Sequence, residues 1–165
     1  MAFDVFVKID GIPGESLDDQ HKDWIEVLFF EHALEQPASA TASSSGGATA
    51  ERVNHKPFTF VHQIDKSSPK LYEACCKGTH IKEVVFEFCR AGGEKVKYFD
   101  VKLEQVLVTK VEPKGAANDA EGFPTERVAL SYGKINWTYD QQKRTDGMGG
   151  GSVATGWDLT INKSC

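Results

Sequence analysis

Long hydrophobic runs are missing from this sequence of 165 residues. None approaches the roughly 20 apolar residues that a helix needs to cross a bilayer, so we expect no membrane insertion. Positive charge is also scarce, since 19 lysines and arginines stand against 24 aspartates and glutamates, a formal net charge of −5. No basic cluster reverses that balance, so we expect no binding to nucleic acid.

A secretory leader is not expected either. The opening residues, MAFDVFVKIDG, have no basic segment, and Asp4 and Lys8 interrupt their apolar residues. We therefore expect the protein to be made and folded in the cytoplasm. Hydrophobic residues make up 40% of the chain and charged residues 26%, which is typical of a soluble globular protein. The length suits one domain over residues 1–165.

Cysteine is sparse, at four residues, and its spacing fits neither of its usual structural roles. Cys75 and Cys76 are adjacent and do not form an ordinary disulfide with each other. Together with His80 and Cys89 they lack the short Cys-x-x-Cys spacing of a zinc site. We therefore expect no metal site and no cofactor, and interpret the thiols as buried or half-buried side chains.

Alternation of apolar and polar residues is the dominant pattern and predicts antiparallel strands. Apolar residues occupy odd positions from Phe3 to Ile9 and even positions from Val84 to Phe88, and a final strand is expected over residues 153–161.

Two segments change parity partway along. Apolar positions are odd up to Leu103 and even from Val106, and they are even up to Tyr132 and odd from Ile135, with Gly133 between. Such a change is typical of a β-bulge, where a long strand bends. Because bent strands can close a sheet, we predict a mainly β fold, an antiparallel β-barrel.

One short helix is expected beside the barrel, in the segment SSPKLYEACCKG. Ser68 can cap its start, Pro69 suits its first turn and Gly78 can end it. Residues 36–53 are rich in alanine, serine, threonine and glycine and predict an extended loop with little to bury. A shorter loop is expected over residues 114–123.

Two motifs suggest chemistry by their letters alone. The run from Asp18 to His21, Asp-Asp-Gln-His, could bind a metal or transfer protons, but no second cluster accompanies it, so we interpret it as a solvated loop. Residues 149–154 match a dinucleotide-binding pattern, yet an alternating strand follows where that site needs a helix, so we expect a flexible turn. We expect no catalytic residues and no enzyme activity.

The segment that follows Asp18–His21, residues 24–30, is apolar on both sides. As a strand it would carry Ile25, Val27 and Phe29 on one face and Leu28 and Phe30 on the other. An antiparallel strand usually buries one face and exposes the other. A strand that is apolar on both needs a second cover, either a helix of this chain or a neighbouring subunit, and the sequence leaves both open.

Five segments in a fixed order carry a family resemblance. They are DVFVKIDGIPGES, IDKSSPKLYEAC, RAGGEKVKYFDVKLEQVLVTKV, ERVALSYGKINWTYDQQ and GWDL. Together they extend nearly from end to end, and the chain resembles Hcp, the haemolysin-coregulated protein family of bacterial type VI secretion. The resemblance implies a β-barrel flanked by a helix and assembled into hexameric rings.

The resemblance also implies partners. Hcp rings stack into a hollow tube inside a contractile sheath, and the tube is expelled with a VgrG-type spike protein at its tip. The lumen can carry effector toxins, and this export needs no signal peptide. The expected partners are therefore further copies of the chain, the spike, the sheath and effectors. The alternative function is that of a monomeric β-barrel that binds a small apolar ligand.

Three sets of residues receive roles from the resemblance. Glu31 and His32 are expected to face the lumen and, because they stand where the family commonly has Trp-Ser-Trp-Gly, to make it more acidic. The subunit interface is expected to use Ile25, Val27, Leu28, Phe29 and Phe30. The loop over residues 36–53 is expected to project from the ring and to contact the next ring, with Ser39, Ser44 and Thr49 as candidates.

Overall fold

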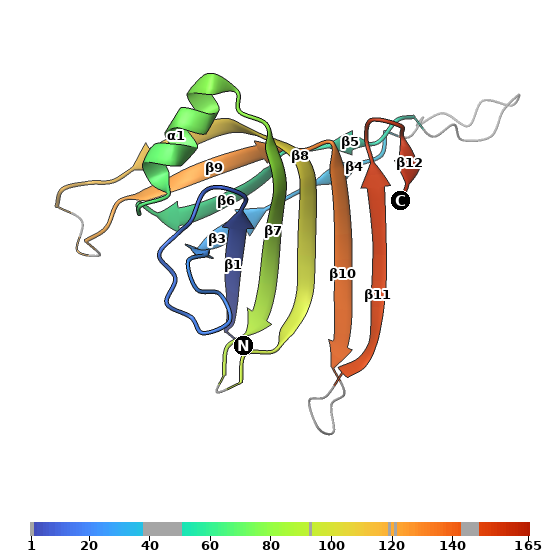
Figure 1. Cartoon of the computed structure of the whole chain (residues 1–165), viewed down its shortest axis with the longest axis horizontal. Helices are drawn as coiled ribbons and strands as arrows, with labels where there is room; N and C mark the ends of the chain where they lie inside the picture. The colour runs from blue at the N-terminus through green and yellow to red at the C-terminus, as the bar shows by residue number, and fades with distance from the viewer. Residues whose placement is uncertain (1, 38–50, 93, 119, 121, 143–148) are drawn as a thin grey trace, which may run out of the picture.

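The computed structural model describes residues 2–37, 51–92, 94–118, 120, 122–142 and 149–165. It is mainly antiparallel β-structure with a short helix, as the sequence predicted (Figure 1). The strands are β1 (Phe3–Ile9), β2 (Ile25–Val27), β3 (Phe29–Glu31), β4 (Leu34–Glu35), β5 (Asn54–His55), β6 (Phe58–Gln63), β7 (Ile81–Arg90), β8 (Lys97–Lys114), β9 (Thr125–Ser131), β10 (Lys134–Gln142), β11 (Gly149–Asp158) and β12 (Lys163–Ser164). The helix is α1 (Ser68–Lys77).

The hydrogen-bonded ladders run around a barrel-like body. β1 pairs with β7, β7 with β8, β8 with β9, β9 with β6, and β6 with β3. β3 follows β2, which pairs with β1, and Leu28 between them donates its N–H to the Val61 carbonyl at 2.8 Å. The path therefore returns to its first strand through Leu28, although β2 and β3 belong to separate ladders.

β8 bends between two groups of partners. Its first part pairs with β7 and β10, and its last part pairs with β9. At the bend Gln105 has a φ of 54°, and the buried positions pass from Leu103 to Val106. The N–H of Gly133, between β9 and β10, lies 3.2 Å from the Gln105 carbonyl oxygen. Both predicted parity changes are therefore confirmed, and they meet at this one point.

β10, β11 and β12 extend the sheet beyond the barrel-like body (Figure 1). Two predictions were wrong here. Residues 149–154, expected as a flexible turn, lie in β11, where they pair with β10. Leu159 and Ile161, expected in the final strand, lie in the turn between β11 and β12. The extent of β11 is set by its pairing with β10, which runs from Gly149 to Asp158. A local sequence pattern does not reveal that partner strand.

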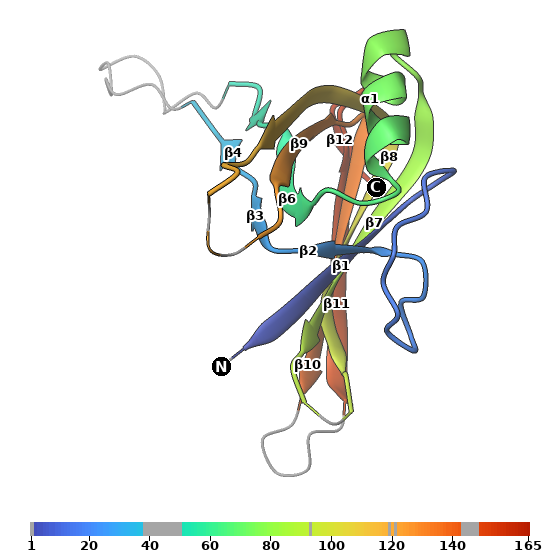
Figure 2. The ribbon, with the colours of Figure 1, turned by 90° about the vertical axis from the view of Figure 1, so that its left-hand side faces the viewer.

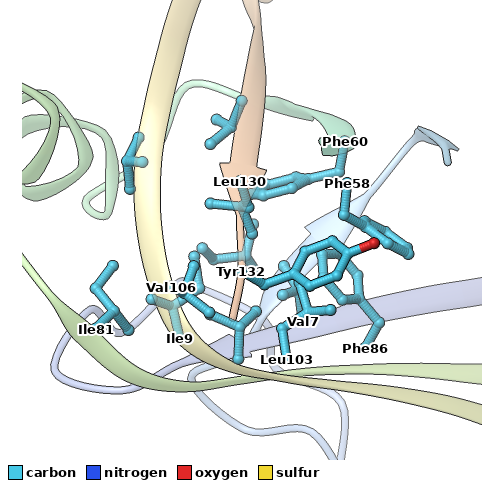
Figure 3. Close-up of a cluster of buried hydrophobic side chains, with 14 of the residues drawn as sticks. Val7, Ile9, Phe58, Phe60, Ile81, Phe86, Leu103, Val106, Leu130 and Tyr132 are labelled. Atoms are coloured by element: carbon cyan, nitrogen blue, oxygen red, sulfur yellow. The ribbon is translucent and has the colours of Figure 1, made fainter. Parts of the chain in front are cut away.

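The interior is filled by side chains from both parts of β8 and from the strands around it. Phe58 and Phe86 lie with ring centroids 4.2 Å apart, and Phe60 lies 5.7 Å from Phe86. Leu103 and Leu130 point into the same space, and both are fully buried (Figure 3). Burying side chains of this size contributes roughly 1.5–3 kcal/mol each, so this cluster stabilises the fold.

The helix begins one residue earlier than predicted. Ser67 is its N-cap and Ser68 is its first residue, which corrects the assignment of Ser68 as the cap. Pro69 lies in the first turn, and Gly78, with a φ of 62°, ends the helix as predicted. No helix in the described part of the chain has the length and apolarity to cross a membrane.

A buried carboxylate holds the helix on the barrel. Glu126 of β9 accepts hydrogen bonds from the Ser68 hydroxyl at 2.7 Å and the Tyr72 hydroxyl at 2.5 Å. His62 Nε2 lies 2.7 Å from the same carboxylate. The hydrogen bond to Glu126 raises the pKa of Tyr72 to about 12. Ser68 therefore anchors the helix to β9, while Ser67 at the N-cap position makes no capping hydrogen bond with its side chain.

Gly14 supplies a first test of the packing, because it lies against the backbone of Trp24. Its N–H donates to the Asp23 carbonyl at 2.8 Å. An added Cβ would clash with the Trp24 carbonyl and lie 2.7 Å from Ile25 Cγ1. Gly14→Ala is therefore expected to lower the free energy of unfolding by about 1–3 kcal/mol, the usual cost of overpacking.

Gly92→Ala is the matched control for urea unfolding of Gly14→Ala. A Cβ at Gly92 would meet no described atom within 4 Å. The control should keep the unfolding midpoint of the parent protein. Equal midpoints for the two variants would contradict the close approach at Gly14.

Candidate functional site

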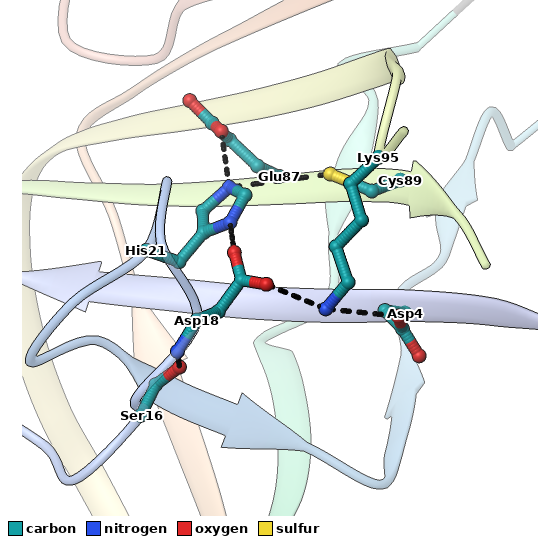
Figure 4. Close-up of polar contacts among 7 residues, drawn as sticks. All are labelled: Asp4, Ser16, Asp18, His21, Glu87, Cys89 and Lys95. Atoms are coloured by element: carbon teal, nitrogen blue, oxygen red, sulfur yellow. Dashed lines mark hydrogen bonds and ion pairs between the residues drawn. The ribbon is translucent and has the colours of Figure 1, made fainter. Parts of the chain in front are cut away.

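His21 lies at the centre of a buried polar cluster, although the sequence predicted a solvated loop from Asp18 to His21. Its side chain is 1% exposed. Its Nδ1 lies 2.7 Å from an Asp18 oxygen and its Nε2 lies 2.7 Å from a Glu87 oxygen (Figure 4). Each ring nitrogen of His21 therefore has a carboxylate oxygen within hydrogen-bond distance. The prediction was wrong for His21, because Glu87 is contributed by β7, far away in the sequence.

Aromatic rings enclose His21 on two sides. It stacks on Phe6 with centroids 4.2 Å apart, and Trp24 meets it edge-on at 4.8 Å. Phe6 is the apolar exception on the otherwise polar face of β1. That exception is the sequence signal for this site, since an aromatic side chain on a polar face needs a cover.

Lys95 extends the cluster to a third carboxylate. Its ammonium lies 2.7 Å from Asp18 and 3.3 Å from Asp4. The hydrogen bond to Asp18 raises the pKa of Lys95. Asp4, Asp18, His21, Glu87 and Lys95 form what we call the His21 cluster, and it binds the segment after β1 to the β7–β8 hairpin.

Cys89 raises the question of a cysteine nucleophile, because its sulfur lies 4.0 Å from His21 Nε2. That nitrogen already faces Glu87 at 2.7 Å. Burial, followed by the charge of Glu87, raises the pKa of the Cys89 thiol to about 11. A nucleophilic cysteine needs a lowered pKa, so this arrangement suits a structural contact and not catalysis.

The other thiols have varied surroundings. Cys75 is half-buried, as expected, while Cys76 and Cys165 are exposed, which corrects the prediction for those two. Cys76 is exposed because its position on α1 faces away from the buried residues Leu71 and Ala74.

The segment Ile25–Glu31 changes the side that it presents to the core. Ile25 is fully buried, and Val27 and Phe30 pack against the core. Leu28 and Phe29 point outward and are 60% and 50% exposed. The sequence predicted that Phe29 shares a face with Ile25 and Val27. That prediction was wrong, because Phe29 points outward. The strict alternation fails because the chain passes from the β1 ladder to the β6 ladder at Leu28.

An ion pair lies beside the outward aromatic ring. Arg127 of β9 lies 3.0 Å from Glu31, and its guanidinium carbon lies 5.7 Å from the centre of the Phe29 ring. Glu31 is exposed, and His32 is half-buried. Arg127 offsets the charge of Glu31, which sequence reasoning treated as a free carboxylate.

His32 and His55 converge on one hydroxyl group. His32 Nε2 lies 2.6 Å from the Tyr132 hydroxyl, and His55 Nδ1 lies 2.9 Å from it. His55 belongs to β5, which pairs with β4 as a separate two-stranded ladder. That ladder is the stem of the predicted extended loop, and Ser39, Ser44 and Thr49 lie outside the described residues.

Comparison with known proteins decides the family. The family model described as "Type VI secretion system effector, Hcp" matches residues 6–139. The chain belongs to the Hcp family. Protein hcp1 of Pseudomonas aeruginosa is 36% identical over 163 residues, which cover 98% of each chain.

Solved Hcp structures share the whole fold. A structure described as a type six secretion system protein has a TM-score of 0.92 at 30% identity and covers 99% of this chain and 100% of that chain. Hcp1 from Salmonella typhimurium has a TM-score of 0.80 at 32% identity, with full coverage of both chains. The resemblance found in the sequence is therefore confirmed. The Hcp family match covers residues 6–139, so it includes the His21 cluster apart from Asp4, and it includes the segment Ile25–Glu31.

The His21 cluster of this Hcp protein predicts an acid-dependent loss of stability. Lys95 lowers the pKa of Asp18 below its ordinary value of 3.8 by a hydrogen bond, and His21 adds to this against the effect of burial. The folded state therefore binds this proton less readily than the unfolded state. The stability that Asp18 contributes is present above about pH 4 and is lost as the pH falls through the folded-state pKa.

Asp18→Asn should accordingly differ most from the parent near about pH 6, and the difference in unfolding free energy should shrink toward about pH 3. Urea unfolding at each pH measures it. Asp19→Asn is the control, because Asp19 is exposed, and no such pH-dependent difference is expected for it. A difference for Asp18→Asn that stays constant with pH would contradict this role.

Proposed function

We propose that this Hcp protein is the tube subunit of a type VI secretion system. One barrel unit over residues 1–165 assembles with further copies into a closed hexameric ring, and rings stack into a hollow tube. The tube is expelled and carries effectors in its lumen. The observation that carries this proposal is the outward apolar surface of Leu28 and Phe29, which are 60% and 50% exposed.

That surface favours a neighbouring subunit over a helix of the same chain. The helix α1 packs against β8 and buries Leu71 and Ala74 there. Figure 2 shows α1 beside β8, away from β2 and β3. Large exposed apolar side chains that adjoin each other mark interaction surfaces. A head-to-tail contact that closes into a ring leaves no subunit with this surface uncovered.

The packed interior argues against the alternative function. A ligand-binding barrel needs an internal cavity, whereas this interior is filled by aromatic rings: the Phe86 ring lies 4.2 Å from that of Phe58 and 5.7 Å from that of Phe60. We therefore favour a tube subunit over a monomeric barrel that binds a small apolar ligand.

The proposed partners follow from a tube that is assembled and then expelled. They are the contractile sheath around the tube, a VgrG-type spike protein at its tip and effector toxins within. The subunit is proposed to be made in the cytoplasm and exported by the secretion machinery itself. The neutral, buried Cys89 thiol and the enclosed His21 support a structural protein without catalysis.

Glu31 remains our candidate for the lumen surface, because it is exposed while its neighbour His32 turns toward Tyr132. Its pairing with Arg127 at 3.0 Å makes this surface less acidic than the sequence suggested. A paired surface of this kind suits polar cargo of either charge, and not only basic cargo.

Leu28→Glu tests the ring. A charge at an apolar contact between copies opposes assembly, so the native mass is expected to fall from hexamer to monomer. The fold should persist, since substitutions at exposed positions usually change stability by less than about 0.5 kcal/mol. Native mass spectrometry and circular dichroism on one preparation measure both quantities.

Leu17→Glu is the matched control for the ring. Leu17 is 91% exposed, but it lies in the polar segment before His21. This variant should stay hexameric. A hexamer with Leu28→Glu, or a monomeric parent protein, would contradict the proposal.

The extended loop is proposed to contact the next ring through the region of Ser39, Ser44 and Thr49. Deleting residues 39–49 and joining the ends with a short glycine–serine link should preserve the hexamer and its thermal transition. The strands of the ring lie outside the deletion, and a segment this poor in large apolar residues cannot offset its ordering cost of roughly 1–2 kcal/mol per residue.

The same deletion should reduce stacking into tubes. Electron microscopy counts the tubes, and native mass spectrometry reports the rings. A link of equal length that replaces residues 39–49 is the control for chain length. Tubes as abundant as those of the parent protein would show that the loop does not mediate stacking.

A further inference from the structure

A single hydroxyl group joins the stem of the extended loop to the barrel. The Tyr132 hydroxyl, at the end of β9, lies 2.6 Å from His32 Nε2 and 2.9 Å from His55 Nδ1. His32 follows β3, and His55 lies in β5. We call these three side chains the His32–Tyr132–His55 latch. Tyr132 itself is 7% exposed, so an unpaired hydroxyl there would be destabilising.

The protons in this latch can be counted. A tyrosine hydroxyl has one hydrogen to donate, and its oxygen accepts. With two neutral rings, Tyr132 donates to one imidazole nitrogen and accepts from the N–H of the other, which satisfies both contacts. One added proton still leaves an acceptor, because the second ring remains neutral.

A second added proton breaks the arrangement. Both imidazole nitrogens are then donors, so the hydroxyl hydrogen has no acceptor between them. Two positive charges also face one oxygen across 2.6 and 2.9 Å. The state with both rings charged and both contacts intact is therefore destabilised by a buried hydroxyl hydrogen without an acceptor and by the repulsion between the two charges, and this favours the departure of one histidine.

We propose that the His32–Tyr132–His55 latch is an acid-sensitive switch that holds the β4–β5 stem on the barrel at neutral pH and releases it when both histidines are protonated. The histidine that leaves is His55. β5 pairs with β4 through two residue pairs only, whereas His32 packs on the Phe58 ring with centroids 5.1 Å apart.

The surroundings agree with release in acid. Burial, followed by the charge of His55, lowers the pKa of His32 below its ordinary value of 6.5, and a hydrogen bond with the Lys56 backbone acts in the opposite direction. Burial lowers the pKa of His55 as well. Burial also raises the pKa of Tyr132, so the hydroxyl keeps its proton.

The sign of the pH dependence follows from these directions. Both histidines bind protons more readily when released, so the latched state is fully stabilised above about pH 6.5 and weakens as the pH falls below that value.

Charged groups near the latch are already paired. Lys56 lies 3.5 Å from Glu35 across the stem, and Arg127 lies 3.0 Å from Glu31 on the outward face of β3. Neither carboxylate is among the partners of the two imidazoles in the described part of the chain. Besides burial, the charge that lowers the pKa of His32 is that of His55.

A consequence for the tube rests on the proposed function. If the extended loop contacts the next ring, its release in acid weakens stacking while the subunit interface at Leu28 is unaffected. Stacked tubes should then come apart into intact rings as the pH falls.

Hydrogen exchange of the stem tests the switch directly. The Lys56 N–H donates to the Ala33 carbonyl at 3.0 Å across the stem and is the reporter amide. After correction for the intrinsic rate, its exchange is expected to quicken roughly tenfold between about pH 7.5 and pH 5.5, as one extra bound proton requires. The Phe86 amide in β7 reports whether the barrel stays folded.

Three variants separate the switch from a merely structural contact. Glutamine donates and accepts without titrating, so His55→Gln should keep slow exchange at both pH values. Tyr132→Phe removes the shared hydroxyl and should exchange fast at both. His80→Gln, at an exposed position, should behave as the parent protein does.

Two results would overturn the switch: exchange at Lys56 that does not change with pH, or a His55→Gln variant as pH-sensitive as the parent. If the Phe86 amide also loses protection in His55→Gln, His55→Asn takes its place. Slow exchange of the Lys56 amide at both pH values is expected for it as well. Because the readout is local, pH-dependent exchange without any change in stacking would count against the loop's proposed function and leave the switch standing.

Discussion

One strand serves two parts of the sheet, and the rest of the structure depends on how it bends. β8 pairs with β10 before Gln105 and with β9 after it, while its pairing with β7 reaches Val106. Gln105 adopts a φ of 54°, which typically costs a residue other than glycine about 1–3 kcal/mol. Gly133 approaches the same point from the other side, and its N–H meets the Gln105 carbonyl at 3.2 Å. Without this bend β9 could not turn toward β6, and the interior around Phe58 and Phe86 would stay open.

Histidines hold the segments that the ladders leave free. His21 binds the segment after β1 through two carboxylates, His62 joins the Glu126 site beneath α1, and His32 with His55 holds the stem of the extended loop. Each uses ring nitrogens that face a carboxylate or a hydroxyl within 2.9 Å. Imidazole suits this position because its two nitrogens can bond in opposite directions from one flat, packable ring. At His32 and His55, where the partner is a shared hydroxyl, burial opposes the charged form of both rings.

The outward surface of the barrel has a different character. Leu28, between β2 and β3, and Phe29, in β3, are exposed, whereas Val27 and Phe30 beside them pack against the core, and the Arg127 guanidinium lies over the Phe29 ring. Membership of the Hcp family and the position of α1 away from this face support the proposal that the surface is a contact between copies. In the proposed ring, the same short segment would close the subunit and present its contact surface.

The sequence by itself determined the family, the mainly antiparallel β fold, the helix and the two parity changes, because each rests on local periodicity or on an ordered series of segments. Only the tertiary structure decided that His21 is buried, that Phe29 faces outward, that Ser68 anchors the helix without capping it, and that residues 149–154 are a strand. His21 meets Glu87 and His32 meets Tyr132 across 66 and 100 positions of the chain. The register of several ladders sets those meetings, and no window of local sequence contains it. Alternation predicts which faces a strand has, but the partner strand decides which of them is covered.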